Sequence, residues 1–209
     1  MGRADHAAFA REVSRRFRLD LYPRDVVLCL RGEGGSDALL GFGPRRRIGN
    51  AAEVLRLLRA EVSSFVGPQP PGDPRGRGAP RVRLHGAVAA SGGGGLGPSR
   101  NASFIDQVRL FSTCALLVGT TGAGMMNMLF MPPSGVVVVL QPRGVAEFYA
   151  AVAAGFGHYP IVHFVPCASD PQLGTEFAGL STKLCSSIVP CKNRAAHMCL
   201  VQVDLTTFQ

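Results

Sequence analysis

The chain has 209 residues, of which 46% are hydrophobic, and this is enough for one domain with a sizeable apolar core. Its 26 Gly and 15 Pro residues exclude a coiled coil or a helical bundle throughout. The net charge is +8, but half of the excess lies in the Gly/Pro-rich residues 67–100 without interleaved aromatic residues, so we expect a soluble basic surface and no nucleic-acid partner.

The first half of the chain predicts two helices separated by a strand. A helix is expected over about 5–18, followed by a buried strand over 25–30. Asn50 and Glu53 form a capping pair that predicts the start of a second helix, whose apolar residues recur on one side. A short strand is expected within 81–88.

The second half of the chain continues to alternate between strands and helices. The expected strands cover about 114–118, 136–140, 161–165 and 200–203, and helices are expected to begin near 103, 123 and 145. Residues 136–140 are four valines and a leucine, which is typical of the centre of a parallel sheet. The pattern predicts an α/β fold with a doubly wound, mostly parallel, Rossmann-like sheet.

The predicted organisation has three parts. Residues 1–24 form an amino-terminal helix and connecting segment, and residues 25–166 form the Rossmann-like lobe, with Gly/Pro-rich loops at 67–80 and 91–100. Residues 167–209 form a Cys-bearing extension with a last strand. No apolar run approaches the roughly 20 residues of a membrane span, and the first residues lack the apolar stretch of a secretory signal.

One glycine-rich segment, residues 119–124 (GTTGAG), lies between a predicted strand and a predicted helix. Backbone N–H groups at such a helix start bind anions, and glycine allows a diphosphate to approach closely. The alternative is a tight turn whose small residues only let the helix pack on the strand. Arg31 follows a buried strand, at the sheet edge where open α/β folds bind ligands, and Arg47 precedes a helix start, so either side chain could hold a phosphate.

The remaining chemistry-bearing residues are cysteines, histidines and one sequon. The cysteines at 167, 185, 191 and 199 could form bridges in an oxidising compartment or remain thiols, and their pairing stays open. Asn101 begins the sequon Asn101-Ala-Ser103 and is a candidate for glycosylation. No two histidines have metal-ligand spacing with a Cys or acidic partner, so we expect no metal site.

Three segments together resemble the carboxyl-terminal half of glycosyltransferase family 61. They are residues 46–53 (RRIGNAAE), 104–108 (FIDQV) and 117–133 (LVGTTGAGMMNMLFMPP). The third segment is the most specific, because the family reads valine-glycine-x-histidine-glycine-alanine-glycine there, followed by an asparagine and then leucine-phenylalanine-methionine-proline-proline. The resemblance covers most of residues 9–165 outside the two loops.

The resemblance implies the donor-binding lobe of a GT-B fold and metal-independent, inverting transfer from a nucleotide sugar such as a UDP-sugar. It implies N-acetylglucosamine, xylose or arabinose as the sugar, a protein or glycan hydroxyl as the acceptor, and the ER or Golgi lumen as the location. The residues that it places at the donor are Arg31, Arg47, Asn50, Thr121, Gly122, Ala123, Gly124 and Asn127. It includes Glu53, Phe104 and Gln107 as motif positions with a possible structural role.

Two departures from the family pattern leave a second function open. Thr121 stands where the family has histidine, and we expect the family's amino-terminal lobe and membrane anchor to be missing from this sequence. A catalytically degenerate nucleotide-sugar-binding or scaffold lobe is therefore the alternative. An unrelated nucleotide-binding enzyme such as a dehydrogenase is a third possibility, although the dinucleotide fingerprint spacing is absent.

Overall fold

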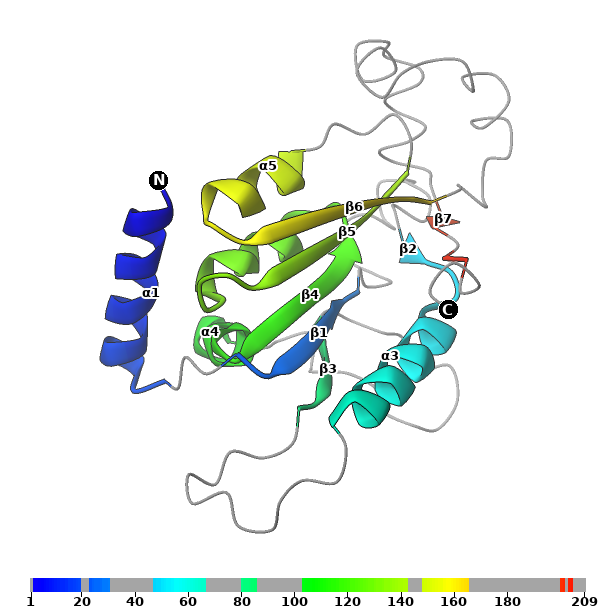
Figure 1. Ribbon diagram of the computed structural model, residues 1–209, viewed down its shortest axis with the longest axis horizontal. Coiled ribbons are helices and arrows are strands. Elements are labelled where there is room, and N and C mark those ends of the chain that lie inside the picture. Colours follow the sequence, from blue (N-terminus) through cyan, green and yellow to red (C-terminus); the bar gives the residue numbers. More distant parts are fainter. Residues whose placement is uncertain are drawn as a thin grey trace.

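The computed structural model describes residues 2–19, 23–30, 47–66, 80–85, 103–142, 148–165, 200–201 and 203–204. Its elements, in chain order, are α1 (Arg3–Phe17), β1 (Asp25–Cys29), β2 (Arg47–Ile48), α3 (Ala51–Val66), β3 (Val82–His85), α4 (Phe104–Ser112), β4 (Cys114–Thr120), the 3-10 helix η1 (Ala123–Phe130), β5 (Val136–Pro142), α5 (Phe148–Gly155), β6 (Tyr159–Val165) and β7 (Leu200–Val201) (Figure 1).

Five of the strands form one parallel sheet in the order β3-β1-β4-β5-β6. Leu28, Val118 and Val138 lie side by side across β1, β4 and β5, as the apolar runs predict. The Rossmann-like parallel sheet expected from the sequence is confirmed. The short strands β2 and β7 make a separate parallel pair, of which the sequence pattern predicts only β7.

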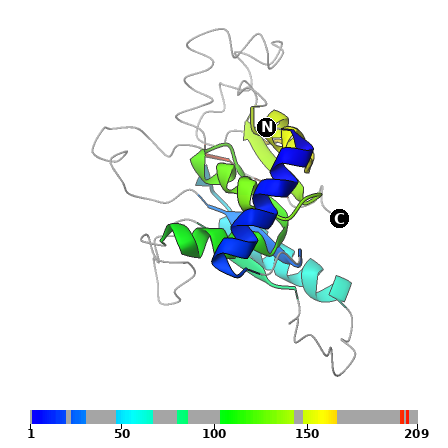
Figure 2. The same ribbon diagram turned by 90° about the vertical axis from the view of Figure 1, so that its left-hand side faces the viewer.

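Side chains alternate between two apolar clusters because successive residues of a strand point to opposite faces. One cluster contains Leu28 and Val118 with Val54 and Leu55 of α3. The other contains Val27 and Leu117 with residues of α4, η1 and α5. Helices therefore cover both faces of the sheet, and α1 lies outside η1 as an outer element (Figures 1 and 2).

The chain reverses its direction of winding between β1 and β4. From β1 it passes through α3 to β3 on one side, and it then returns through α4 to β4 on the other side of β1. It continues outward to β5 and β6. Open α/β sheets bind their ligands at the carboxyl ends of the strands beside such a reversal. This topology makes the end of β4 the place to look for a site.

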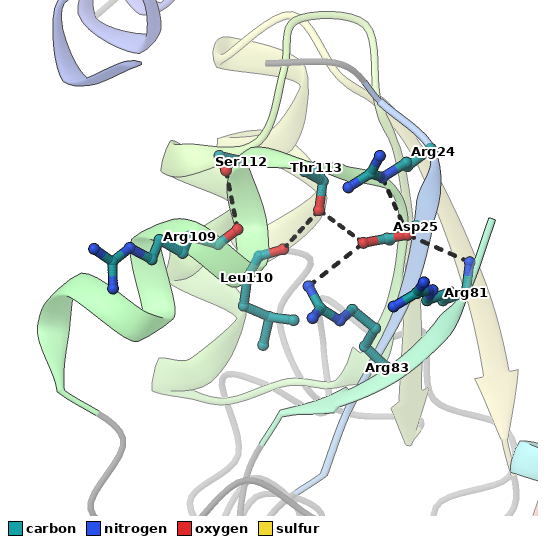
Figure 3. A network of polar contacts seen from close by, with 8 residues as sticks. All are labelled: Arg24, Asp25, Arg81, Arg83, Arg109, Leu110, Ser112 and Thr113. Carbon is teal, nitrogen blue, oxygen red and sulfur yellow. Dashed lines mark hydrogen bonds and ion pairs between the residues drawn. The ribbon is translucent and has the colours of Figure 1, made fainter. Parts of the chain in front are cut away.

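A buried carboxylate ties together the amino ends of three neighbouring strands (Figure 3). Asp25 is 2% exposed, and its Oδ2 accepts a hydrogen bond from Thr113 Oγ1 at 2.8 Å. Its Oδ1 accepts one from the backbone N–H of Arg81 at 3.3 Å. The guanidinium groups of Arg24 and Arg83 lie 3.7 and 3.5 Å from the carboxylate. These contacts align the amino ends of β1, β3 and β4, far from the carboxyl ends at which ligands bind.

Two buried histidines hold the carboxyl end of η1. His6 of α1 contacts the Leu129 carbonyl oxygen through Nε2 at 3.0 Å, and His158 contacts that of Met128 at the same distance. The two rings meet edge to face at 5.0 Å between centroids. Their Nδ1 atoms are sealed from solvent without a hydrogen-bond partner. Burial lowers the pKa of His158, so its ring is neutral at pH 7 and can donate from Nε2 to the Met128 carbonyl oxygen.

Candidate functional site

The glycine-rich turn follows β4 at the reversal of the sheet. Thr121 and Gly122 connect the carboxyl end of β4 to η1, and Thr121 is fully buried. Met125 N–H donates to the Gly122 carbonyl oxygen at 3.0 Å, which is the first hydrogen bond of η1. The N–H groups of Ala123 and Gly124 precede that bond and point toward the start of the helix. Such N–H groups are suited to hold an anion.

Two glycines of this segment let η1 approach β1 closely. A Cβ on Gly119 would lie 2.8 Å from Met125 Sδ and 2.9 Å from Cys29 Cβ. A Cβ on Gly124 would lie 2.8 Å from Cys29 Sγ. At Gly119 the close atoms include Cys29 Cβ and the Cys29 backbone, so packing alone requires glycine there. At Gly124 the close atom is the end of the Cys29 side chain, which would have to shift to admit a Cβ. The packing interpretation and the anion interpretation of the motif are therefore compatible.

The side chains of η1 form three rows because residues three apart eclipse one another in a 3-10 helix. Met125, Met128 and Met131 are fully buried against the sheet. Gly124, Asn127 and Phe130 form a second, half-buried row. The third row begins with two exposed residues. Asn127 is therefore stacked below Gly124, beside the glycine-rich turn.

Asn127 lies at the centre of a polar cluster that joins η1 to β3 and α4. Its Nδ2 contacts His85 Nε2 at 3.1 Å and donates to Gln107 Oε1 at 3.2 Å. The His85 ring packs edge to face on Phe111 with a centroid distance of 5.0 Å. The ring also lies close to Gly124, because a Cβ added at Gly124 would be 3.6 Å from His85 Cδ2. Burial lowers the pKa of His85, so the ring is neutral at pH 7 and Nε2 can accept a hydrogen bond.

His85 is a site residue that the sequence reasoning missed. It ends β3, and the strand expected within 81–88 included it without marking where that strand would end. Its neighbour β1 is bonded there, since Leu30 N–H donates to the His85 carbonyl oxygen at 2.6 Å. The available signal was a histidine near the carboxyl end of a predicted parallel strand, the edge at which ligands bind.

Asn50 is bound to the end of the described chain. Its Nδ2 donates to the Val203 carbonyl oxygen at 2.8 Å, and its Oδ1 accepts from the Val203 N–H at 3.1 Å. Glu53 reaches the Asn50 side chain at 3.3 Å, so the expected capping pair takes a different form. Because both ends of the Asn50 carboxamide are engaged by Val203, its prediction as a donor ligand has no support from these contacts.

The other predicted site residues fall into two groups. Phe104 begins α4, is 58% exposed and packs edge to face on Phe130. Arg47 belongs to β2 through its backbone, which pairs with Leu200, and its side chain lies outside the described part of the structure. Outside the described residues altogether are Arg31, Asn101, Cys167, Cys185, Cys191 and Cys199. The structure brings Gly122, Ala123, Gly124, Gln107 and Asn127 to one place.

A cavity of about 360 Å³ lies on the other face of the sheet, between α3 and β4–β6. It is lined by aliphatic side chains, among them Leu58, Val118 and Val138. A nucleotide sugar presents hydroxyl and phosphate groups that need polar partners, which this lining does not offer. The glycine turn is therefore the better candidate for a polar ligand.

The described residues show neither a metal-binding cluster nor a helix able to span a membrane. These residues contain no group of three His, Cys, Asp or Glu side chains placed to hold a metal ion. None of the helices found among them is both long and apolar enough to cross a bilayer.

Comparison with known proteins points to one family. Residues 97–138 match the family model for Glycosyltransferase 61. A comparison with curated proteins found no match. The matched residues run from the segment before α4 through β4 and η1 into β5, and so include the glycine turn, Gln107 and Asn127. This match supports the assignment of the chain to glycosyltransferase family 61, and with it a glycosyltransferase function in general.

Proposed function

We propose that the chain binds a nucleotide sugar, such as a UDP-sugar, with its diphosphate at the Thr121–Gly124 turn. One observation supports the proposal most strongly. The residues that match the family model include the glycine-rich turn, and this turn lies where the sheet reverses its direction of winding. The sugar would be N-acetylglucosamine, xylose or arabinose, and the acceptor a protein or glycan hydroxyl. The ER or Golgi lumen would be the location.

The proposed reaction is an inverting displacement. The acceptor oxygen bonds to the anomeric carbon while the bond to the diphosphate oxygen breaks, and the hydroxyl proton passes to a base. Negative charge then grows on the departing diphosphate. The N–H groups of Ala123 and Gly124 at the start of η1 would stabilise that charge, and Arg31 and Arg47 would add positive charge. We therefore expect donor binding without a divalent metal.

Ala123→Pro tests the backbone part of this site. Ala123 is the first residue of η1, where proline is tolerated, and Gly122 has an extended backbone (φ 171°, ψ 167°) that suits a following proline. The variant removes one N–H donor, and a hydrogen bond to a charged group contributes about 1.5–3 kcal/mol. Isothermal titration with UDP in EDTA should show a loss of affinity of about tenfold or more.

The matched control is Met126→Ala, an exposed side chain of the same helix. It should leave UDP affinity unchanged. The proposed function is contradicted if wild-type protein binds none of UDP, UDP-N-acetylglucosamine, UDP-xylose and UDP-arabinose, or if Ala123→Pro binds UDP as well as wild type. Binding that requires added manganese or magnesium would contradict the expected metal independence alone.

A further inference from the structure

The carboxamide of Asn127 has a fixed polarity. Both of its recorded contacts are made by Nδ2, to His85 Nε2 and to Gln107 Oε1. A carboxamide nitrogen has two protons, so these contacts use its full donor capacity. Among the described residues none donates to Asn127 Oδ1, and Asn127 as a whole is only half-buried. The half-buried side chain therefore offers an acceptor.

His85 is the residue that sets this polarity. A neutral ring whose Nε2 accepts from Asn127 carries its proton on Nδ1. Burial disfavours the charged ring, which would turn Nε2 into a donor. The edge of the ring that holds Asn127 also faces Gly124, with Cδ2 and Nε2 at 3.6 and 3.7 Å from the Cβ position. The acceptor and the anion-binding turn are thus parts of one surface.

We propose that His85 and Gln107 are positioning residues that hold Asn127 with its oxygen toward the nucleotide sugar, where it accepts a hydrogen bond from a hydroxyl or N–H group. This inference rests on the proposed function. A phosphate oxygen is also an acceptor, so it would repel Asn127 Oδ1 rather than bind it. The backbone of the turn then binds the diphosphate, and Asn127 Oδ1 accepts a hydrogen bond from the sugar or the nucleoside. The family resemblance places Asn127 at the donor, and this proposal assigns it to the sugar or the nucleoside rather than to the diphosphate.

The test compares two probes that share the diphosphate. Inorganic pyrophosphate has no hydroxyl or N–H group of a sugar or nucleoside, whereas UDP-N-acetylglucosamine has both kinds. Asn127→Ala should weaken UDP-N-acetylglucosamine binding about three- to tenfold, the effect of one neutral hydrogen bond, and leave pyrophosphate binding unchanged. Ala123→Pro should weaken both probes, which shows that pyrophosphate occupies the turn. Met126→Ala is the control on the same helix.

Variants of His85 separate positioning from general stability. His85→Leu removes the acceptor and should reproduce the selective loss of UDP-N-acetylglucosamine affinity. His85→Gln offers a carboxamide oxygen to Asn127 Nδ2 and should restore most of the affinity. A residue with only a packing role would not change the ratio between the two probes.

Each outcome decides between the two proposals. If Asn127→Ala weakens both probes equally in folded protein, the inference is wrong while the proposed function stands. If Asn127→Ala does not fold, the two His85 variants provide the test instead. The inference is overturned if His85→Leu and His85→Gln have the same ratio of UDP-N-acetylglucosamine affinity to pyrophosphate affinity. If wild type binds neither probe, the proposed function fails. A loss of UDP affinity in Asn127→Ala assigns the contact to the nucleoside, and a loss for the sugar nucleotide alone assigns it to the sugar.

Discussion

Gly124 and Cys29 are in contact where η1 passes over the end of β1. We therefore expect the effects of substitutions at these two positions on the free energy of unfolding to be coupled. Gly124→Ala would place a Cβ 2.8 Å from Sγ of the buried Cys29. Overpacking of this kind costs about 1–3 kcal/mol. The added Cys29→Ala substitution removes Sγ and should recover most of that loss. Urea denaturation of the two single variants and the double variant measures the coupling.

Gly119 provides the control for this pair of residues. A Cβ on Gly119 would meet Cys29 Cβ at 2.9 Å and the Cys29 carbonyl oxygen at 3.1 Å, and neither atom is removed by Cys29→Ala. Gly119→Ala should therefore remain destabilising in the Cys29→Ala background. Equal rescue of both glycine variants, or rescue of neither, would contradict the packing explanation.

His158 predicts an acid-dependent loss of stability. Burial lowers the pKa of His158 to about 4, and the neighbouring His6 also disfavours its charge. Its ordinary value is 6.5. Between these values the unfolded chain binds a proton that the folded chain does not, so the free energy of unfolding falls as the pH falls from 6.5 toward 4. The full effect is about 3 kcal/mol, and it is absent above pH 6.5.

The comparison of His158→Gln with wild type measures this effect. The glutamine amide can still donate toward the Met128 carbonyl oxygen but does not titrate. Urea midpoints between pH 7 and pH 4 should fall less steeply in the variant. Ala154→Gln, an exposed neighbour on α5, should keep the wild-type slope. An unchanged slope in His158→Gln would place the acid sensitivity elsewhere.

At the scale of elements, η1 shows what periodicity in a sequence can and cannot predict. The sequence predicts a helix that begins near residue 123, and a helix is present over Ala123–Phe130, but it is of the 3-10 type. The buried methionines recur at a spacing of three, which also fits an α-helical stripe over so short a segment. Gly119 and Gly124 determine how closely the helix approaches β1, and that is a tertiary contact. The type of the helix and its distance from β1 therefore depend on tertiary packing, which the sequence pattern does not show.

The two hydrogen bonds between Asn50 and Val203, here called the Asn50 clamp, are a long-range contact that no local sequence pattern could predict. It joins the start of α3 to a residue 153 positions later. Asn50→Asp would replace the Nδ2 donor by an oxygen facing the Val203 carbonyl oxygen, so we expect a loss of about 1–3 kcal/mol. Hydrogen exchange should accelerate at the Val203 N–H and at the Gly49 N–H, which donates to Val201.

Ala52→Ser, an exposed substitution in the first turn of α3, is the control for the clamp. It should leave exchange at Gly49 and Val203 unchanged. Slow exchange at Val203 in Asn50→Asp would show that the Val203 N–H is protected by other contacts.

At the scale of the whole molecule, the parallel character of the sheet followed from the sequence more readily than the site. The apolar runs of β1, β4 and β5 required burial on both faces, and this predicts parallel strands with helices between them. The glycine turn and its position after a strand were also readable locally. The partners of Asn127 were not, because His85 and Gln107 belong to other elements and meet it only after the sheet has formed.

The two ends of the strands should have separable roles: the amino ends contribute to stability, and the carboxyl ends contribute to donor binding. Asp25 connects Thr113, Arg81 and Arg83 at the amino ends of the strands, whereas the glycine turn lies after the carboxyl end of β4 (Figures 1 and 3). Asp25→Ala leaves Thr113 Oγ1 without its short hydrogen bond. The Arg83 side chain is 43% exposed and can turn to water, so the expected loss is about 1–3 kcal/mol.

Asp25→Ala should nevertheless bind UDP with wild-type affinity at a temperature where it is folded, because no contact of Asp25 reaches the turn. Urea denaturation and isothermal titration on the same preparation measure the two properties. Arg109→Ala removes an exposed ion pair to Asp106 and should change neither stability nor affinity appreciably. A folded Asp25→Ala protein with weakened UDP binding would contradict the separation, because it would show that the alignment of strand starts also sets the geometry of the turn at their far ends.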